Sequence, residues 1–189
     1  AFLLTATLLI LFFAPHSTRA CVCGLIEPDA AYQNAFLVFT GMVEKVTDRR
    51  REVDQDGKSI TRIAVEEYFK GTGGREIELR GSNSSCDIGF EEGKRYVVYA
   101  TRVGESGELG AFSCSRTRLL DDYAKPDISY LHRAARGERP TMLYGFAFKT
   151  TGESAKRRER EPLGELAVTV EGEGRRLELK TDVRGYFET

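Results

Sequence analysis

The chain has 189 residues, of which 28 are Lys or Arg, 29 are Asp or Glu, 4 are Cys and none is Trp, giving a formal net charge of −1. This length suffices for one or two globular domains, and a charged fraction of 30% is too ordinary for a disordered tail. The near-zero net charge also argues against a nucleic-acid binder, which would need basic residues gathered on one face.

Residues 1–14 form one apolar run, AFLLTATLLILFFA. The run is too short to cross a bilayer, which takes about 20 helical residues, and it fits the apolar core of a secretory signal. The small residues Thr18 and Ala20 occupy the first and third positions of a cleavage-like tripeptide, and a cut after it would leave Cys21 as the N-terminus. We therefore predict a signal peptide over residues 1–20 and a secreted protein, extracellular or periplasmic, without a stable membrane span.

Two alternatives remain for this segment. A Cys directly after an Ala is also what lipoprotein processing needs, in which case Cys21 would be acylated and would anchor the chain to lipid. Thr18 and Arg19 match that signal poorly. The other alternative is a cytosolic protein with a buried apolar N-terminal helix, which leaves the cleavage-like tripeptide unexplained.

The four cysteines all lie beyond the predicted cleavage point, at positions 21, 23, 86 and 114. An even number of cysteines in an exported chain predicts two disulfides. Four thiolates could instead bind zinc, but two of these cysteines stand alone rather than in CxxC pairs. A bridge from Cys21 to Cys23 would need a tight ring outside relaxed disulfide geometry, so we expect each of them to pair with a distant cysteine. Two pairings satisfy that condition.

The next elements are mostly strands. A short helix is predicted over 27–35, because Pro28 and Asp29 suit a first helical turn. A charged hairpin turn is expected at 48–57, and Gly41 indicates a bend or bulge in the strand before it. The predicted strands, rich in β-forming residues, are 36–46, 60–70, 76–80, 95–103 and 108–114. Five strands without a βαβ rhythm predict an antiparallel barrel or sandwich.

A helix is then expected over 119–136, interrupted at Pro126. It would pack on the barrel through Leu119, Leu120, Tyr123, Ile128 and Leu131. The polar sequence GERP at 137–140 predicts a domain boundary. Beyond it we expect strands at 142–150, 166–171, 177–181 and 185–189, with a charged, solvated loop over 152–162.

The order of these motifs resembles a known family. The residues that carry the resemblance are CVC at 21–23, FKG at 69–71, KRYVVYA at 94–100, and the single cysteines Cys86 and Cys114. They are similar to the netrin-like module, whose best-known members are the tissue inhibitors of metalloproteinases. Over about residues 21–136 the resemblance implies a mainly β fold, an OB-like five-stranded antiparallel barrel with flanking helices. It also implies the disulfide pairs Cys21–Cys86 and Cys23–Cys114.

The resemblance further implies a secreted inhibitor of a zinc metalloendopeptidase, with Cys21, Val22 and Cys23 contacting the protease. A free α-amino group has a pKa of roughly 7.7 to 8.0, so part of it is uncharged at neutral pH and can bind a metal. The Cys21 amino nitrogen and carbonyl oxygen would chelate the zinc of the target protease, displacing the nucleophilic water. Val22 would then point into the adjacent specificity pocket.

The chain departs from those inhibitors at two places. Their module has a third disulfide, where this chain has Tyr32 and Gln33, and their second mature residue is usually Ser or Thr rather than Val22. The alternative function is therefore an extracellular or cell-surface binding or structural module, in which the CxC motif only ties the first strand to the barrel.

The segment 138–189 resembles a second family. Its motifs are LYGFA at 143–147, PLGELAVTV at 162–170 and TDVRGYF at 181–187. They are similar to the carboxypeptidase-regulatory-like domain, which implies a partial Ig-like or prealbumin-like β-sandwich that serves as a spacer or adhesive stalk. The predicted domains are thus a signal peptide at 1–20, a netrin-like domain at 21–137 and this partial sandwich at 138–189.

No sequence feature predicts an enzyme or a cofactor. HExxH, GxSxG and phosphate-binding glycine motifs are absent. After cleavage the only imidazole is His132, which we expect on the solvent side of a helix. The sequence Asn83-Ser84-Ser85 is a glycosylation sequon beside Cys86.

Overall fold

The computed structural model describes residues 21, 23–47, 59–82, 84–104, 107–151 and 159–189. The predicted signal peptide at 1–20, the charged turn at 48–57, Val22 and Asn83 lie outside the described residues. Among the residues that are described, no helix has the length and apolar composition needed to span a membrane.

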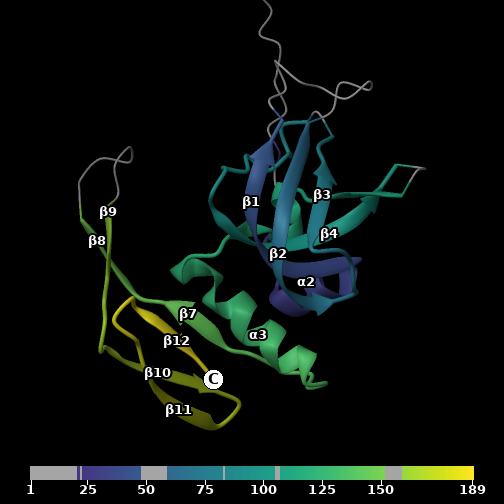
Figure 1. Ribbon diagram of the computed structural model, residues 1–189. Coiled ribbons are helices and arrows are strands. Elements are labelled where there is room, and N and C mark those ends of the chain that lie inside the picture. The colour runs from purple at the N-terminus through teal and green to yellow at the C-terminus, as the bar shows by residue number, and fades with distance from the viewer. Residues whose placement is uncertain (1–20, 22, 48–58, 83, 105–106, 152–158) are drawn as a thin grey trace, which may run out of the picture.

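Five antiparallel strands form a nearly closed barrel (Figure 1). They are β1 (Leu37–Val46), β2 (Ile60–Lys70), β3 (Glu76–Arg80), β4 (Arg95–Val103) and β5 (Glu108–Gly110), in the order β3-β2-β1-β4-β5. The outer strands of this order approach each other, and Arg80 Nε lies 2.8 Å from Glu108 Oε1 across the remaining gap. The predicted mainly β fold with a five-stranded antiparallel barrel and flanking helices is confirmed.

The position of β4 between two cores explains why its sequence contains a continuous apolar run. Tyr96 and Val98 point into the barrel core, whereas Val97 and Tyr99 belong to a second core on the outer face. Because successive side chains of a strand face opposite sides, a strand covered on both faces needs apolar residues at every position. The second core also contains the helix residue Leu131, so the helices cover this face of the barrel.

Gly41 lies at an irregularity of β1, as predicted. The register with β2 shifts between Thr40 and Gly41. A Cβ atom at Gly41 would lie only 2.5 Å from the carbonyl oxygen of Ala64. The close approach of the two strands therefore requires glycine at this position.

The helices agree with the sequence prediction in place but not in all bounds. α2 (Pro28–Asn34) forms as expected. The second helix, α3 (Lys125–Ala135), has Pro126 in its first turn, so the prediction of a helix interrupted there is wrong. Proline is tolerated in a first turn because its missing N–H would have no helical partner there. Residues 118–124 instead form β6 (Arg118–Leu119), which pairs with β4, and the 3₁₀ turn η2 (Asp122–Ala124).

The contacts expected from the 119–136 segment are only partly made. Leu120, Ile128 and Leu131 pack in the outer core. Leu119 and Tyr123 remain 37% and 44% exposed, because both precede α3 and do not share its inward face.

The segment after residue 137 forms three separate two-stranded sheets. The pairs are β7 (Tyr144–Phe146) with β12 (Tyr186–Glu188), β8 (Phe148–Thr151) with β9 (Glu159–Pro162), and β10 (Ala167–Gly172) with β11 (Arg175–Lys180). The single strand predicted over 142–150 is thus two strands that separate at Ala147, and the predicted loop over 152–162 ends in a strand. The segment consists mainly of strands, as expected, but a β-sandwich over 138–189 stays a prediction.

Helix α3 lies between the barrel and the β7–β12 pair (Figure 1). Ser129 in α3 donates a hydrogen bond to Glu188 at 2.9 Å. Lys125, at the start of α3, pairs with Asp182 just before β12 at 2.5 Å. These contacts join the barrel to the downstream segment.

Candidate functional site

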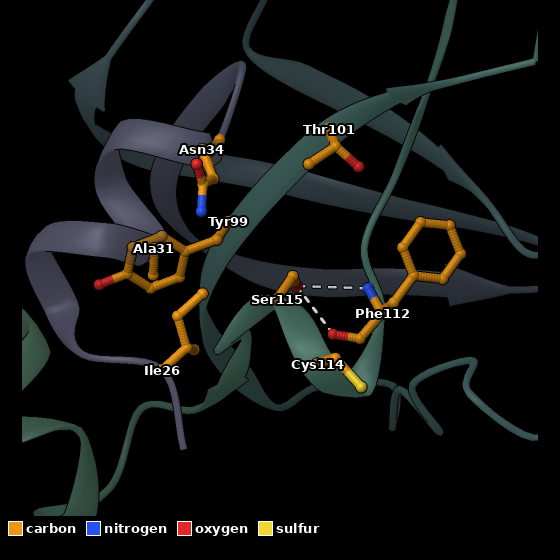
Figure 2. A pocket seen from close by; sticks show the side chains of 9 residues that line it. Ile26, Ala31, Asn34, Tyr99, Thr101, Phe112, Cys114 and Ser115 are labelled. Carbon is orange, nitrogen blue, oxygen red and sulfur yellow. Dashed lines mark hydrogen bonds between the residues drawn. The ribbon is translucent and has the colours of Figure 1, made fainter. Parts of the chain in front are cut away.

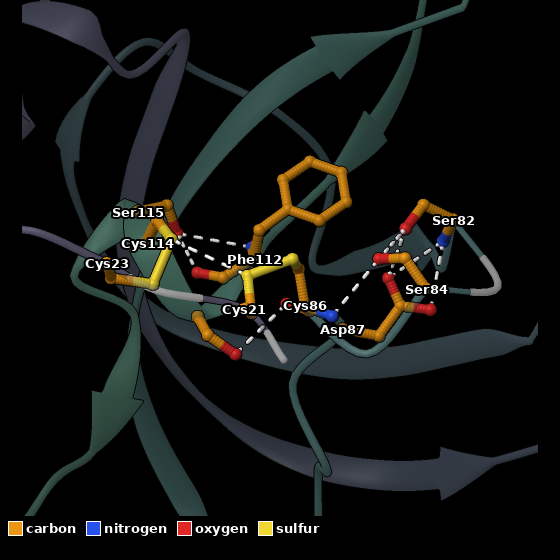
Figure 3. The surroundings of a disulfide bond; sticks show 10 residues. Cys21, Cys23, Ser82, Ser84, Cys86, Asp87, Phe112, Cys114 and Ser115 are labelled. Carbon is orange, nitrogen blue, oxygen red and sulfur yellow. Dashed lines mark hydrogen bonds between the residues drawn. A yellow bond between two sulfur atoms is a disulfide. The ribbon is translucent and has the colours of Figure 1, made fainter. Parts of the chain in front are cut away.

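Two disulfides attach the CxC motif to the barrel (Figure 3). Cys21 pairs with Cys86 and Cys23 pairs with Cys114, with Cα–Cα distances of 5.3 and 5.1 Å. This is the pairing implied by the netrin-like resemblance. Two disulfides are typical of proteins that fold in an oxidising, extracellular type of environment.

The two receiving cysteines lie side by side because their segments pair. Asp87 and Phe112 form an isolated antiparallel bridge. Ser113 donates to the Cys86 carbonyl oxygen from its backbone nitrogen at 2.8 Å and from its hydroxyl at 3.0 Å. Cys114 itself lies in the 3₁₀ turn η1 (Ser113–Ser115), so the prediction that strand five extends to Cys114 is wrong. The turn moves its sulfur to the surface, where the CxC segment can reach it.

The sulfur atoms form a compact cluster. The Sγ atoms of Cys21 and Cys114, which belong to different bridges, are 3.8 Å apart. Together with Cys23, their sulfurs all lie within 4.8 Å of one another. Both bridges are oxidised and the described residues contain no free cysteine, so this cluster supplies no thiolate to a metal. The zinc-thiolate alternative therefore does not fit these four residues.

The turn that carries Cys86 is held by a carboxylate. Asp87 accepts hydrogen bonds from the Ser82 hydroxyl at 2.6 Å and from the Ser82 backbone nitrogen at 2.9 Å. The Ser84 hydroxyl in turn accepts from the backbone nitrogen of Cys86. These hydrogen bonds hold the turn on which Cys86 is bonded to Cys21 (Figure 3).

The chain around the CxC motif is open to solvent. Cys21 is partly buried, whereas Cys23, Gly24 and Leu25 are exposed. The Leu25 side chain is fully exposed, at 101% of its reference area.

A pocket of about 250 Å³ lies behind this segment (Figure 2). It is bounded by α2, β4 and η1. Its lining is mostly apolar and includes Ile26, Ala31, Tyr99, Phe112 and Cys114. The pocket therefore adjoins the Cys23–Cys114 bridge through Cys114.

An ion pair, which sequence analysis missed, lies beneath the same segment. Arg116 Nε lies 2.5 Å from Asp127 Oδ1, and the Asp127 side chain is fully buried. The Tyr99 hydroxyl donates to the same carboxylate oxygen at 2.7 Å. The only sequence signal is the position of Arg116 two residues after a cysteine, which does not by itself indicate burial.

The buried ion pair shifts the pKa values of its members. Burial alone would lower the pKa of the Arg116 guanidinium, but the Asp127 carboxylate outweighs this and the net shift is upward. Burial and the same carboxylate raise the pKa of the Tyr99 phenol far above its usual range. Arg116 thus stays charged and Tyr99 stays protonated at neutral pH.

His132 is half exposed on α3, as predicted. Its ring lies edge-on to Phe69 at 5.3 Å between centroids, and its Nδ1 is 3.9 Å from a Glu67 carboxylate oxygen. The neighbouring Glu66 binds Arg95 at 2.6 Å.

No protein-family model matches this chain, and no curated protein is significantly similar to it.

Proposed function

We propose that the exported chain is an inhibitor of a zinc metalloendopeptidase, with Cys21 as its N-terminal residue after removal of residues 1–20. The amino nitrogen and carbonyl oxygen of Cys21 would chelate the zinc of the target protease. The zinc belongs to the protease, and this chain needs no cofactor of its own. Val22 lies outside the described residues, so its contact with the specificity pocket rests on the resemblance to the tissue inhibitors of metalloproteinases.

One observation carries this proposal: two adjacent disulfides fix an exposed segment at the surface of the barrel. A chain terminus normally frays unless it is tied down. Here the Cys21 and Cys23 side chains are both covalently held, and the following residues are solvent-exposed. A segment that is already ordered loses less conformational entropy when it binds, which favours affinity.

The chemistry suits the proposed role of Cys21. Its sulfur is committed to Cys86, so only the backbone amine and carbonyl remain as metal ligands. A catalytic zinc in a protease has three protein ligands and an open position occupied by water. Chelation at that position would remove the water that the protease activates as nucleophile.

The second candidate is an extracellular or cell-surface binding or structural module. It is favoured by the contacts that the same N-terminal segment makes with the body of the protein. The Ile26 carbonyl accepts a hydrogen bond from Arg116, and Glu27 accepts one from Tyr144 at 2.8 Å. In this candidate the two disulfides serve only as an anchor, and residues 138–189 act as a spacer resembling a carboxypeptidase-regulatory-like domain.

The first experiment is N-terminal sequencing and mass measurement of exported protein. A free Cys21 amine is the expected result. An acylated Cys21, or retention of Ala20, would block the amine and leave the lipid-anchored or binding-module alternatives.

The second experiment compares three forms of the protein against a panel of zinc endopeptidases. One form begins at Cys21 and a second carries a single additional N-terminal Ala. We expect inhibition by the first form only, because the added residue converts the amine into an amide that cannot bind zinc. A third form with the extra Ala at the C-terminus is the matched control and should inhibit like the first. Equal inhibition by all three forms, or none by any, contradicts the proposal for the enzymes tested.

A further inference from the structure

The segment 23–26, which is exposed at Cys23, Gly24 and Leu25, is attached to the protein at both ends, and both attachments lead to the same turn. At one end Cys23 is bonded to Cys114. At the other end the Ile26 carbonyl oxygen accepts a hydrogen bond from Arg116 Nη1. Only Gly24 and Leu25 lie between the two attachments, and both are exposed. The two residues between the attachments are therefore fixed at both ends and exposed to solvent.

The Arg116 side chain is itself immobilised. It is only 7% exposed, and its Nε lies against the buried Asp127 carboxylate. A guanidinium has five N–H donors in a planar fork, so it can bind several acceptors at once, which a lysine ammonium on a flexible stem does not reproduce. The backbone of Arg116 also has φ 71°, a left-handed conformation that is disfavoured for residues other than glycine.

A third contact brings in the segment beyond residue 137. Arg116 Nη2 donates to the Tyr144 hydroxyl at 3.2 Å, and this hydroxyl donates to Glu27 Oε2 at 2.8 Å. Tyr144 belongs to β7, which pairs with β12 near the end of the described chain. The downstream segment thus contacts both Arg116 and Glu27, the residue that directly follows segment 23–26.

We infer that Arg116 is a positioning residue for the N-terminal segment, and that Tyr144 extends this hold to the downstream part of the chain. The inference rests on the proposed function, because segment 23–26 begins at Cys23, one of the proposed protease-contacting residues, and directly follows the other two. It adds that the zinc-binding end is kept rigid from beneath by a charged network, in addition to the two disulfides. The region 138–189 then contributes to the site through Tyr144, although it carries none of the proposed zinc-binding atoms.

The test measures backbone ¹⁵N order parameters of Gly24 and Leu25 in the full exported chain. In the unaltered protein we expect values of about 0.85, as for rigid backbone, in spite of full exposure. Arg116→Lys should lower them to below about 0.6, because an ammonium cannot hold Asp127 and the Ile26 carbonyl together. Tyr144→Phe, which removes one hydroxyl, should lower them by a smaller amount.

Two controls separate positioning from general stability. Arg118→Lys is the matched control, because Arg118 lies 3.9 Å from the same carboxylate and its guanidinium binds the Tyr123 carbonyl instead of segment 23–26. Ile63→Val weakens the barrel core at a distance. Both should leave the order parameters at Leu25 unchanged.

Inhibition supplies the second readout. Arg116→Lys should raise the inhibition constant about three- to tenfold, from the entropy of ordering the released side chains on binding. Unchanged order parameters in both Arg116→Lys and Tyr144→Phe would overturn the inference, as would an equal loss in Ile63→Val. If Arg116→Lys does not fold, Tyr144→Phe decides alone. If Arg116→Lys lowers the order parameters but the unaltered protein inhibits none of the proteases, the proposed function is refuted and the positioning role of Arg116 stands.

Discussion

Each disulfide of the N-terminal segment can be removed without disturbing the core, so its contribution to stability can be measured. We consider the paired replacement Cys23→Ala with Cys114→Ala. Both residues are exposed, so truncating their side chains leaves no buried cavity. The effect then comes mainly from the greater conformational freedom of the unfolded chain.

The size of the effect depends on the other bridge. Cys23 and Cys114 are 91 residues apart, and closing such a loop alone is worth about 4.6 kcal/mol in the chain-entropy model. With Cys21–Cys86 intact, however, Cys23 is already held close to Cys86, so the remaining loop runs over only about 30 residues. Its closure is worth about 3.6 kcal/mol.

The same reasoning applies to the other bridge, although its separation is only 65 residues. With Cys23–Cys114 intact, the effective loop closed by Cys21–Cys86 is again about 30 residues, worth about 3.6 kcal/mol. We therefore expect nearly equal losses from the two single removals. Removing both bridges should cost about 8 kcal/mol, which is within the range of total stability for a natural domain.

Urea unfolding of the three variants measures these free energies. For a chain of this size each single removal should lower the Tm by about 7 to 14 °C. The control is the unaltered protein with and without a dithiol reductant, since reduction should reproduce the double removal and should not affect the double variant. A loss below about 1 kcal/mol for either bridge, or losses in proportion to 91 and 65 residues, would refute the reasoning.

Two further changes test the fold and its charges. Gly41→Ala should destabilise the protein by about 2 to 3 kcal/mol, because the new Cβ would lie 2.5 Å from the Ala64 carbonyl oxygen. Gly172→Ala, with no atom within 4 Å of its Cβ, is the control in the same urea assay, and an equal loss in both would contradict this account. Asp182→Asn tests the contact with Lys125: burial alone would raise the pKa of the Asp182 carboxyl, but its hydrogen bond with Lys125 contributes to a net lowering below 3.8. Because the folded pKa is the lower one, the carboxylate stabilises the fold above pH 3.8, and this contribution is lost as the pH falls through the folded pKa. Asp182→Asn should therefore be less stable than the unaltered protein at pH 7, and a stability difference that persisted unchanged into strong acid would contradict the assignment.

Much of the barrel was predictable because its signals are local. The apolar run at 95–103 and the glycine at 41 indicate a buried strand and a bulge without knowledge of their neighbours, and both are confirmed. Element ends were less predictable. A proline breaks a helix when it lies in the interior, but it is tolerated in the first turn. Which of these positions Pro126 takes depended on the packing of residues 118–124 against β4.

The sequence by itself determined the strand content of the barrel, the number of disulfides and the exclusion of a bridge between Cys21 and Cys23. These follow from residue periodicity and from covalent geometry, which act over a few positions along the chain. The tertiary structure alone decided that Arg116 lies beneath the N-terminal segment. Its acceptor, the Ile26 carbonyl, is 90 residues away, and neither residue type is unusual in its local sequence. Such a contact forms only because strand pairing and the Cys23–Cys114 bridge bring both segments to one end of the barrel, where a buried carboxylate fixes the guanidinium between them.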